Sequence, residues 1–333
     1  MKPLIKKLVE AYGPSGSEGQ IREIVRAEIK SLPDYISVDP LGNLIAVVKT
    51  KSKSGKRVML SAHLDEIGVM VSHIDERGFA RFTNLGGVSP LTCLGGRVRF
   101  ASGVTGVIGL DARRDDPGKP PTLSELFLDF GAAGRADCPV KVGDAAGFYR
   151  PMEEVGAHRL IAKSLDDRIG VAILIEVMRR LKNSPHEVAF VFSVQEEVGL
   201  RGAGTAAFGL EAEFGLAVDV TRTGDTPNGP KMAVSMGAGP AIKVRDSGML
   251  ADPRVKDLLV QRAVEAQLPY QLEVLEAGTT DAAAMQLARG GMPAGCVSIP
   301  TRYLHTPSEM VDLRDVDGVV SLLVDTLSKP IEI

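Results

Sequence analysis

The sequence predicts an α/β protein with a mixed β-sheet, into which a small β domain, a barrel or a sandwich, is inserted. Apolar, β-branched runs of strand length alternate with helical patterns near the N-terminus and again from Asp166 to the C-terminus. Between these parts, residues 68–109 hold nine glycines in 42 positions, about twice the chain average, among short strand-like runs. A chain of 333 residues also exceeds the size at which a single core usually stops growing, so a second domain is expected.

The N-terminal part predicts two helices and two strands of the larger domain. An apolar period over Leu4–Tyr12 indicates a short helix, which a Gly-Pro pair ends. Ser15–Glu18 has the Ser-x-x-Glu spacing of a capping box, and an amphipathic pattern over Ile21–Ile29 follows it. The apolar runs Leu44–Val48 and Arg57–Ala62 are typical of strands.

The middle of the chain predicts the inserted β domain, at residues 68–159. Its β-type runs are short, are separated by turns and show little helical periodicity; they include Val69–Ile74, Phe79–Phe82, Arg97–Phe100 and Leu126–Phe130. Helix–strand alternation resumes from Asp166, so the larger domain is discontinuous and consists of residues 1–67 and 160–333.

Composition excludes several classes of protein. The chain is 44 % hydrophobic and 24 % charged, as in ordinary globular proteins, and its net charge of -3 gives no electrostatic reason to bind nucleic acid or an anionic membrane. No apolar run is long enough to span a bilayer, and no signal peptide is recognised at the start. The three cysteines, Cys93, Cys138 and Cys296, are far apart and are expected to be reduced. These features predict a cytoplasmic protein.

Side chains that can bind metals follow several of the predicted strands. Val188–Ser193 is typical of a strand buried on both faces, and two adjacent acids come after it. Because ligands in open α/β sheets bind beyond the carboxyl ends of the strands, we expect such residues to converge. The residues in question are His63, Asp65, Asp166, Asp167, Glu196, Glu197, Asp219 and His305. Buried carboxylates without a cationic partner are costly, so this cluster predicts a bound cation.

The donor types narrow the choice of cation. Imidazole and carboxylate groups without cysteine suit zinc, cobalt or manganese rather than a structural thiolate zinc. Two histidines and several acids exceed what one tetrahedral ion needs, whereas a pair of ions bridged by a carboxylate would use them. Of Glu196 and Glu197, one can then bind metal while the other acts as general base.

The other histidines are predicted to lie outside this site. A second His-x-Asp pattern includes His73 and Asp75, but it falls inside the inserted domain just before a turn, so His73 is expected at an exposed strand end. His158 and His186 have no acid at a useful spacing, and both are predicted to lie at the surface.

Taken together, these motifs resemble those of the tetrahedral (TET) aminopeptidases, the glutamyl-aminopeptidase-like dinuclear metallopeptidases. The similarity runs in the same order over nearly the whole chain. The matching segments are His63–Gly68, Leu165–Arg168, Gln195–Gly199, Asp219, Gly278–Asp281 and Pro300–Pro307. The resemblance implies a zinc-peptidase-like catalytic domain that carries the inserted β-barrel.

The resemblance also implies a ligand set for two divalent ions, zinc or cobalt by preference and manganese as an alternative. One ion would be bound by His63, Asp166 and Asp219, and the second by Asp166, Glu197 and His305. Asp166 would therefore bridge the two ions.

The remaining implied roles concern catalysis and assembly. Glu196 would be the general base and Asp65 would orient His63, while Asp167 and Arg168 would support the ligands. Members of the family assemble from dimers into hollow tetrahedral dodecamers. The resemblance thus implies a homo-oligomer in which the inserted domain contributes contacts.

The leading hypothesis is a metal-dependent aminopeptidase that releases N-terminal residues from peptides, with a water activated by two metals and Glu196 as base. A related dinuclear deacylase or carboxypeptidase is an alternative, for which Arg222 or Arg302 would hold the substrate carboxylate. A β-glucanase is disfavoured because the chain has no Trp and few aromatic residues. A non-catalytic assembly protein is the remaining alternative.

Overall fold

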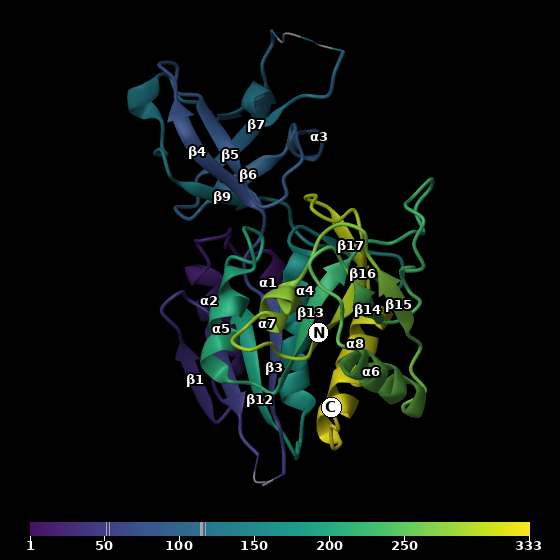
Figure 1. Cartoon of the computed structure of the whole chain (residues 1–333). Helices are drawn as coiled ribbons and strands as arrows, with labels where there is room; N and C mark the ends of the chain where they lie inside the picture. Colours follow the sequence, from purple (N-terminus) through teal and green to yellow (C-terminus); the bar gives the residue numbers. More distant parts are fainter. Residues whose placement is uncertain (51, 53, 114–115, 117) are drawn as a thin grey trace.

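The structure is a computed structural model that describes residues 1–50, 52, 54–113, 116 and 118–333. A large mixed β-sheet covered by helices forms the body of the molecule, and a closed β-barrel stands beyond one end of it (Figure 1). The predicted fold class, a mixed-sheet α/β domain with an inserted β-barrel, is confirmed.

The described residues of the body form an eleven-stranded sheet. Its strands are β1 (Tyr35–Val38), β2 (Leu44–Val48), β3 (Arg57–His63), β10 (Glu153–Val155), β11 (Arg159–Ala162), β12 (Glu187–Ser193), β13 (Phe214–Thr221), β14 (Ala241–Arg245), β15 (Gln271–Val274), β16 (Ala294–Arg302) and β17 (Glu309–Asp312). The main order is β1-β2-β12-β3-β13-β16-β17-β11-β10, with β14 paired to β16 and β15 paired to β14. The central strands β12, β3, β13 and β16 are parallel, so their carboxyl ends meet at one edge.

Helices cover both faces of the sheet. Successive side chains of a strand point to opposite faces, so the apolar strands of this sheet bury side chains on both of them. On β3, Val58 and Leu60 belong to one hydrophobic cluster and Met59 belongs to the other. The first cluster includes apolar residues of α1 (Lys2–Val9), α2 (Gly19–Ile29), α4 (Leu165–Arg180), α6 (Pro253–Glu265) and α8 (Leu313–Ser328). The second includes residues of α5 (Arg201–Leu210) and α7 (Asp281–Gln286).

The barrel has its own core and follows directly on β3. Its elements are β4 (Gly68–Ile74), β5 (Ala80–Leu85), α3 (Pro90–Cys93), β6 (Arg97–Phe100), β7 (Thr105–Leu110), η1 (Leu123–Glu125), β8 (Leu126–Asp129), η2 (Arg135–Asp137) and β9 (Ala145–Phe148). Strands close in the order β4-β5-β8-β7-β6-β9 around a separate apolar cluster. Because the chain passes from the carboxyl end of β3 into β4, the barrel lies beyond the parallel strand ends (Figure 1). The exact domain limits and the barrel's role in oligomerisation stay predictions.

Two local predictions are wrong, because tertiary partners replace the expected local ones. Ser15 does not cap α2; its hydroxyl donates to Asp65 Oδ2 at 2.6 Å, and the Glu18 carboxylate accepts from Gln195 N. His186 is buried, not at the surface: Lys56 N donates to its Nδ1, and its Nε2 lies 2.9 Å from the Lys329 carbonyl. His73, by contrast, is exposed in β4 as predicted.

The three cysteines are free. Within the described part of the chain, no helix has both the length and the apolar character needed to cross a membrane.

Candidate active site

The parallel strands bring the predicted residues to one edge of the sheet. His63 is the last residue of β3 and pairs in register with Ser193, the last residue of β12, so the loop after β12 starts beside it. Asp219 lies within β13, which continues to Thr221. His305 follows β16 after a short loop.

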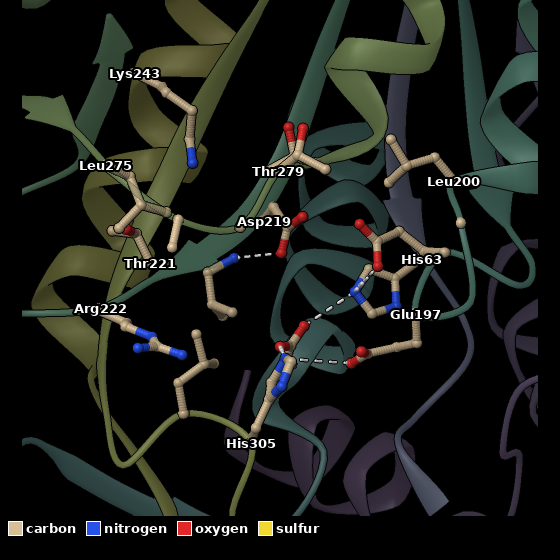
Figure 2. Close-up of a pocket in the computed structure, with 18 residues that line it drawn as sticks. His63, Glu197, Leu200, Asp219, Thr221, Arg222, Lys243, Leu275, Thr279 and His305 are labelled. Carbon is tan, nitrogen blue, oxygen red and sulfur yellow. Dashed lines mark hydrogen bonds and ion pairs between the residues drawn. The ribbon is translucent and has the colours of Figure 1, made fainter. Parts of the chain in front are cut away.

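Asp166 lies between the two imidazoles. Its Oδ1 is 3.0 Å from the Nε2 of His63, and its Oδ2 is 3.1 Å from the Nε2 of His305. These two imidazoles are labelled in Figure 2. Asp166 and Asp167 fall within the bounds of α4 but have non-helical dihedral angles, so the regular helix starts after them. One carboxylate thus spans two imidazoles that are far apart in the sequence.

The remaining predicted ligands surround this group. Glu197 Oε1 is 3.6 Å from His305 Nε2, and Glu196 Oε2 is 4.0 Å from His63 Nε2. Asp219 shares a group with His63 and Asp167 in which the candidate ligand atoms lie within 4.8 Å of one another. All the residues predicted for the site therefore converge.

Two further acids hold these residues in place. Asp65 accepts from the backbone N–H groups of Glu196 and Glu197, at 3.0 and 3.2 Å, and its carbonyl lies 3.0 Å from His63 Nδ1. Asp167 accepts from the backbone N–H groups of His63 and Gly170. Both oxygens of Asp167 thus accept hydrogen bonds, and one of them also lies within 4.8 Å of candidate ligand atoms of His63 and Asp219, so its supporting role stays a prediction.

The sequence does not predict the roles of two buried acids behind the site. Glu309 accepts from Asp166 N at 3.0 Å and from His305 N at 2.9 Å, so one side chain fixes two ligand backbones. Asp281 accepts from the hydroxyls of Ser61 and Ser193, which lie near the ends of β3 and β12. For Glu309, the sequence signal is its position four residues after His305. Asp281 ends the matching segment Gly278–Asp281, but that segment predicts no role for it.

Burial of so many acids together changes their protonation. Burial raises the pKa of Glu197 to about 8 and that of Asp219 to about 7, and in both cases the negative charge of Asp166 adds to the increase. Burial lowers the pKa of His305, but its hydrogen bond to Asp166 and the negative charges of Asp166, Glu197 and Glu309 together outweigh burial and raise the pKa to about 10. The acids therefore resist ionising side by side, and a bound cation would favour their ionised forms.

The donor set fits divalent metal ions. Glu197 Oε1 is buried and has no hydrogen-bond partner among the described residues. An unpartnered buried carboxylate oxygen is costly, and here it lies beside imidazole nitrogens and other carboxylates, the donors that zinc, cobalt and manganese accept. Two groups of residues have candidate ligand atoms within 4.8 Å of one another: His63, Asp167 and Asp219, and His63, Asp166 and Glu197. His305 Nε2 lies 3.1 Å from Asp166 Oδ2, at the edge of the second group.

A mixed α/β sheet that gathers imidazoles and carboxylates at the carboxyl ends of its parallel strands defines a metal-dependent hydrolase. The sequence model of the M42 glutamyl aminopeptidase family matches residues 42–322. The chain belongs to this family, and the resemblance to TET aminopeptidases is confirmed. It is a metal-dependent aminopeptidase, and its cofactor is divalent metal.

Two curated relatives match almost end to end. A putative aminopeptidase of Acetivibrio thermocellus is 46 % identical over 98 % of this chain and 98 % of its own. The lysyl aminopeptidase of Pyrococcus furiosus is 36 % identical over 96 % of this chain and 94 % of its own.

Two solved structures share the whole fold. Aminopeptidase APDkam598 from the archaeon Desulfurococcus kamchatkensis superposes with a TM-score of 0.93 at 39 % identity, covering 99 % of this chain and 94 % of its own. The TET1 peptidase of Pyrococcus horikoshii superposes with a TM-score of 0.88 at 29 % identity, covering 99 % of both chains. The second protein can assemble into a tetrahedron or a large octahedral shell.

Proposed function

We propose that the chain hydrolyses the first peptide bond of peptide substrates, with two divalent ions and Glu196 as general base. His63, Asp166 and Asp219 would hold one ion, and Asp166, Glu197 and His305 would hold the other. The observation that supports this best is the position of Asp166, whose two oxygens face two different imidazoles at 3.0 and 3.1 Å. A carboxylate shared in this way is what a two-metal hydrolytic site requires.

The chain's own residues supply the proton transfer. When bound, the ions would polarise the scissile carbonyl and lower the pKa of a water, so that the water can lose a proton and attack the carbonyl near neutral pH. Glu196 takes the proton from the attacking water as its oxygen bonds to the carbonyl carbon. Glu196 then gives that proton to the leaving nitrogen as the C–N bond breaks, so one water is consumed and the carboxylate is regenerated.

Glu196 is suited to this role because its side chain is not committed elsewhere. Its backbone N–H is held by Asp65, whereas its carboxylate has no hydrogen bond within the described residues and lies 4.0 Å from His63. Glu197, directly beside it, is drawn toward His305. The adjacent acids therefore divide into one base and one ligand.

Replacing Glu196 with Gln tests this assignment. The amide keeps the shape but removes the basicity, so we expect kcat to fall by a factor on the order of 10³ while elemental analysis still counts two ions per chain. Restoring the stripped protein with zinc, cobalt or manganese, one at a time, identifies the productive metal. Turnover close to wild type in E196Q would reject the assigned base.

The dinuclear carboxypeptidase and deacylase alternatives need a cation for the substrate carboxylate. Arg302 is not free for this purpose, because its guanidinium donates two hydrogen bonds to Asp225 at 2.7 and 3.0 Å. Arg222 lines the pocket and remains a candidate. Matched peptides with free and acetylated N-termini separate the alternatives, since only a deacylase or carboxypeptidase accepts the blocked peptide.

We also propose a homo-oligomeric state, with dimers as building blocks of a tetrahedral dodecamer. The similarity to the TET1 peptidase over 99 % of both chains supports this assembly. Cytoplasmic location stays a prediction from the sequence.

A further inference from the structure

A turn of the inserted barrel lies directly against the proposed metal ligands. The turn consists of Gly86 and Gly87 and follows β5, whose last residue, Leu85, pairs with Gly68 at the start of β4. Val88, after the turn, packs on the apolar core of the barrel. The two glycines are therefore anchored on both sides to the barrel and belong to it, not to the sheet that carries the proposed ligands.

Each glycine faces a different ligand proposed for the second ion. A Cβ built on Gly87 would lie 2.4 Å from Nδ1 and 2.8 Å from Cε1 of His305. A Cβ built on Gly86 would lie 2.9 Å from Oε2 of Glu197 and 3.0 Å from its Cβ. The two ligands also face each other, with 3.6 Å between Glu197 Oε1 and His305 Nε2 (Figure 2). The turn thus leaves no room for a side chain beside either ligand.

The backbone of this turn is held by hydrogen bonds. The Gly86 carbonyl accepts from Nδ2 of Asn84 at 2.7 Å and from the backbone N–H of Val88 at 3.0 Å. Because the second bond joins residues two apart, Gly87 is the centre of a tight turn. The turn can therefore act as a wall, since moving it would break backbone hydrogen bonds.

The imidazole of His305 depends on such a wall more than that of His63 does. Nδ1 of His63 lies 3.0 Å from the carbonyl oxygen of Asp65, an interaction that fixes the ring while Nε2 faces a metal. Nδ1 of His305 has no hydrogen-bond partner among the described residues, and the side chain of His305 is 30 % exposed, against 2 % for His63. Packing against Gly87 is therefore what restrains the Nδ1 edge of the His305 ring.

We infer that the Gly86–Gly87 turn is a positioning element for the reaction, through which the inserted barrel holds His305 and Glu197 in place to bind the second ion. This inference rests on the proposed two-ion function, and it gives the barrel a role at the catalytic centre besides its proposed role in assembly. His63 and Asp219 belong to strands of the body, so the first ion does not depend on the turn in this way.

Gly87→Ala is the variant that tests this inference. The φ angle of Gly87 lies outside the left-handed region, so alanine can adopt its backbone conformation, whereas Gly86 has a φ of +74° and strains any replacement. The new methyl group would meet the end of a side chain, and we expect the imidazole of His305 to move away. The affinity for the second ion should then fall by about 10- to 100-fold, while that for the first ion stays within about twofold of wild type.

Calorimetric titration of the metal-free chains with zinc measures both affinities, and elemental analysis after dialysis counts the bound ions. We expect two ions per wild-type chain and one per Gly87→Ala chain. The matched control is Gly134→Ala in the same barrel, which should keep both ions because the nearest atom to its new Cβ is 3.6 Å away.

Three results of the titration would contradict the inference. Wild-type affinity for both ions in Gly87→Ala would overturn it and leave the proposed function intact. Equal weakening of both ions would indicate a general loosening of the fold and not the positioning of two ligands. A wild-type chain that binds fewer than two ions would contradict the proposed function itself, and the inference with it.

A double-mutant cycle keeps the inference testable if Gly87→Ala folds poorly. Because the imidazole is what the methyl group would meet, the same substitution in a His305→Ala background should not lower stability. Urea unfolding of the metal-free wild type, single variants and double variant completes the cycle. A loss of stability that persists without the imidazole would show that the turn serves only the barrel, and the inference would be wrong.

Discussion

At the scale of single residues, Asp65 connects the proposed ligands to the proposed base. Its carboxylate accepts from the Ser15 hydroxyl at 2.6 Å and from the backbone N–H groups of Glu196 and Glu197. The imidazole of His63 lies against the same residue, 3.0 Å from its carbonyl. A buried side chain with this many partners orients groups on both sides of the site without itself reacting.

Replacing Asp65 with Asn should therefore weaken metal binding. The amide cannot accept at both of its terminal atoms, so at least one N–H of the Glu196–Glu197 segment loses its partner. We expect zinc affinity to fall by about 10- to 100-fold, measured by calorimetric titration of the metal-free chain.

Asp75 provides the matched control for this substitution, because it ends the second His-x-Asp pattern. Its carboxylate accepts from Arg77 N and Phe79 N in a surface turn of the barrel, remote from the ligands. Asp75→Asn is expected to leave the zinc affinity unchanged. Equal affinities in both variants would show that Asp65 has no orienting role.

The same residues show how far the sequence predicts the site. His63, Asp219 and His305 were found because each accompanies a strand whose apolar run is easy to recognise. Glu309 and Ser15 were missed because their partners are defined only after β17 and the N-terminal segment have packed against the ligands. Sequence patterns identify residues at strand ends, whereas support from another element requires the tertiary structure.

At the scale of elements, the start of α5 packs closely against the loop that carries the two glutamates. Gly202 N donates to the Val194 carbonyl, and Asn43 bridges the two segments by donating to Gly202 O and accepting from Val194 N. A Cβ on Gly202 would lie 2.2 Å from Asn43 Oδ1 and 2.5 Å from Val194 O. Because one of these atoms belongs to the backbone, relief requires the loop itself to move.

Gly202→Ala is thus expected to destabilise the fold by about 1–3 kcal/mol, as overpacked core positions do. The companion variant Gly204→Ala lies in the same helix, where the nearest atom to a new Cβ is 3.8 Å away. There the higher helix propensity of alanine should add about 0.5–1 kcal/mol. Urea unfolding of both variants measures the difference, and two shifts of the same sign would contradict the packing argument.

A second contact between segments makes stability depend on pH. Hydrogen bonds from Arg302 hold the pKa of Asp225 at about 2, joining the segment after β13 to the end of β16. Since the pKa is lower in the folded state than the ~3.9 of an unfolded aspartate, the stabilisation is present above about pH 4 and is lost as pH falls toward 2.

Asp225→Asn should remove this stabilisation. We expect the variant to be less stable than the wild type by about 1–2 kcal/mol at pH 6, with the gap narrowing between pH 4 and pH 2. Urea unfolding at pH 6, 4 and 3 measures the gap. A constant gap at all three values would mean that the side chain acts through packing and not through its charge.

At the scale of the whole molecule, the proposed metal ligands and the barrel belong to different parts of the fold. The sheet supplies the proposed ligands and the barrel stands beyond the same strand ends, connected through the short segment after His63 (Figure 1). Glycine content and short apolar runs predict an inserted β domain, either a barrel or a sandwich, and the structure shows the barrel. The order of the sheet was not predicted, because the short strands β10, β14 and β15 have too few residues for a clear pattern and join through tertiary pairing.

The barrel's proposed part in assembly leads to a prediction about surface residues. Leu91 in α3 is 63 % exposed, and Leu94 and Val142 of the barrel are also exposed, which is unfavourable unless another surface covers them. If barrel contacts hold the oligomer together, Leu91→Asp should lower the mass in solution toward that of the 35.4 kDa chain or its dimer, because a buried carboxylate would be left without a partner.

Light scattering measures this mass directly, and Leu287 supplies the control. Leu287 follows α7 outside the barrel and is 80 % exposed, so Leu287→Asp introduces the same charge on the body of the molecule. A mass reduced only by Leu91→Asp would assign the contacts to the barrel. A wild-type mass in the Leu91 variant together with a reduced mass in the Leu287 variant would transfer the contacts to the catalytic body, and the inserted domain would then need a role other than assembly.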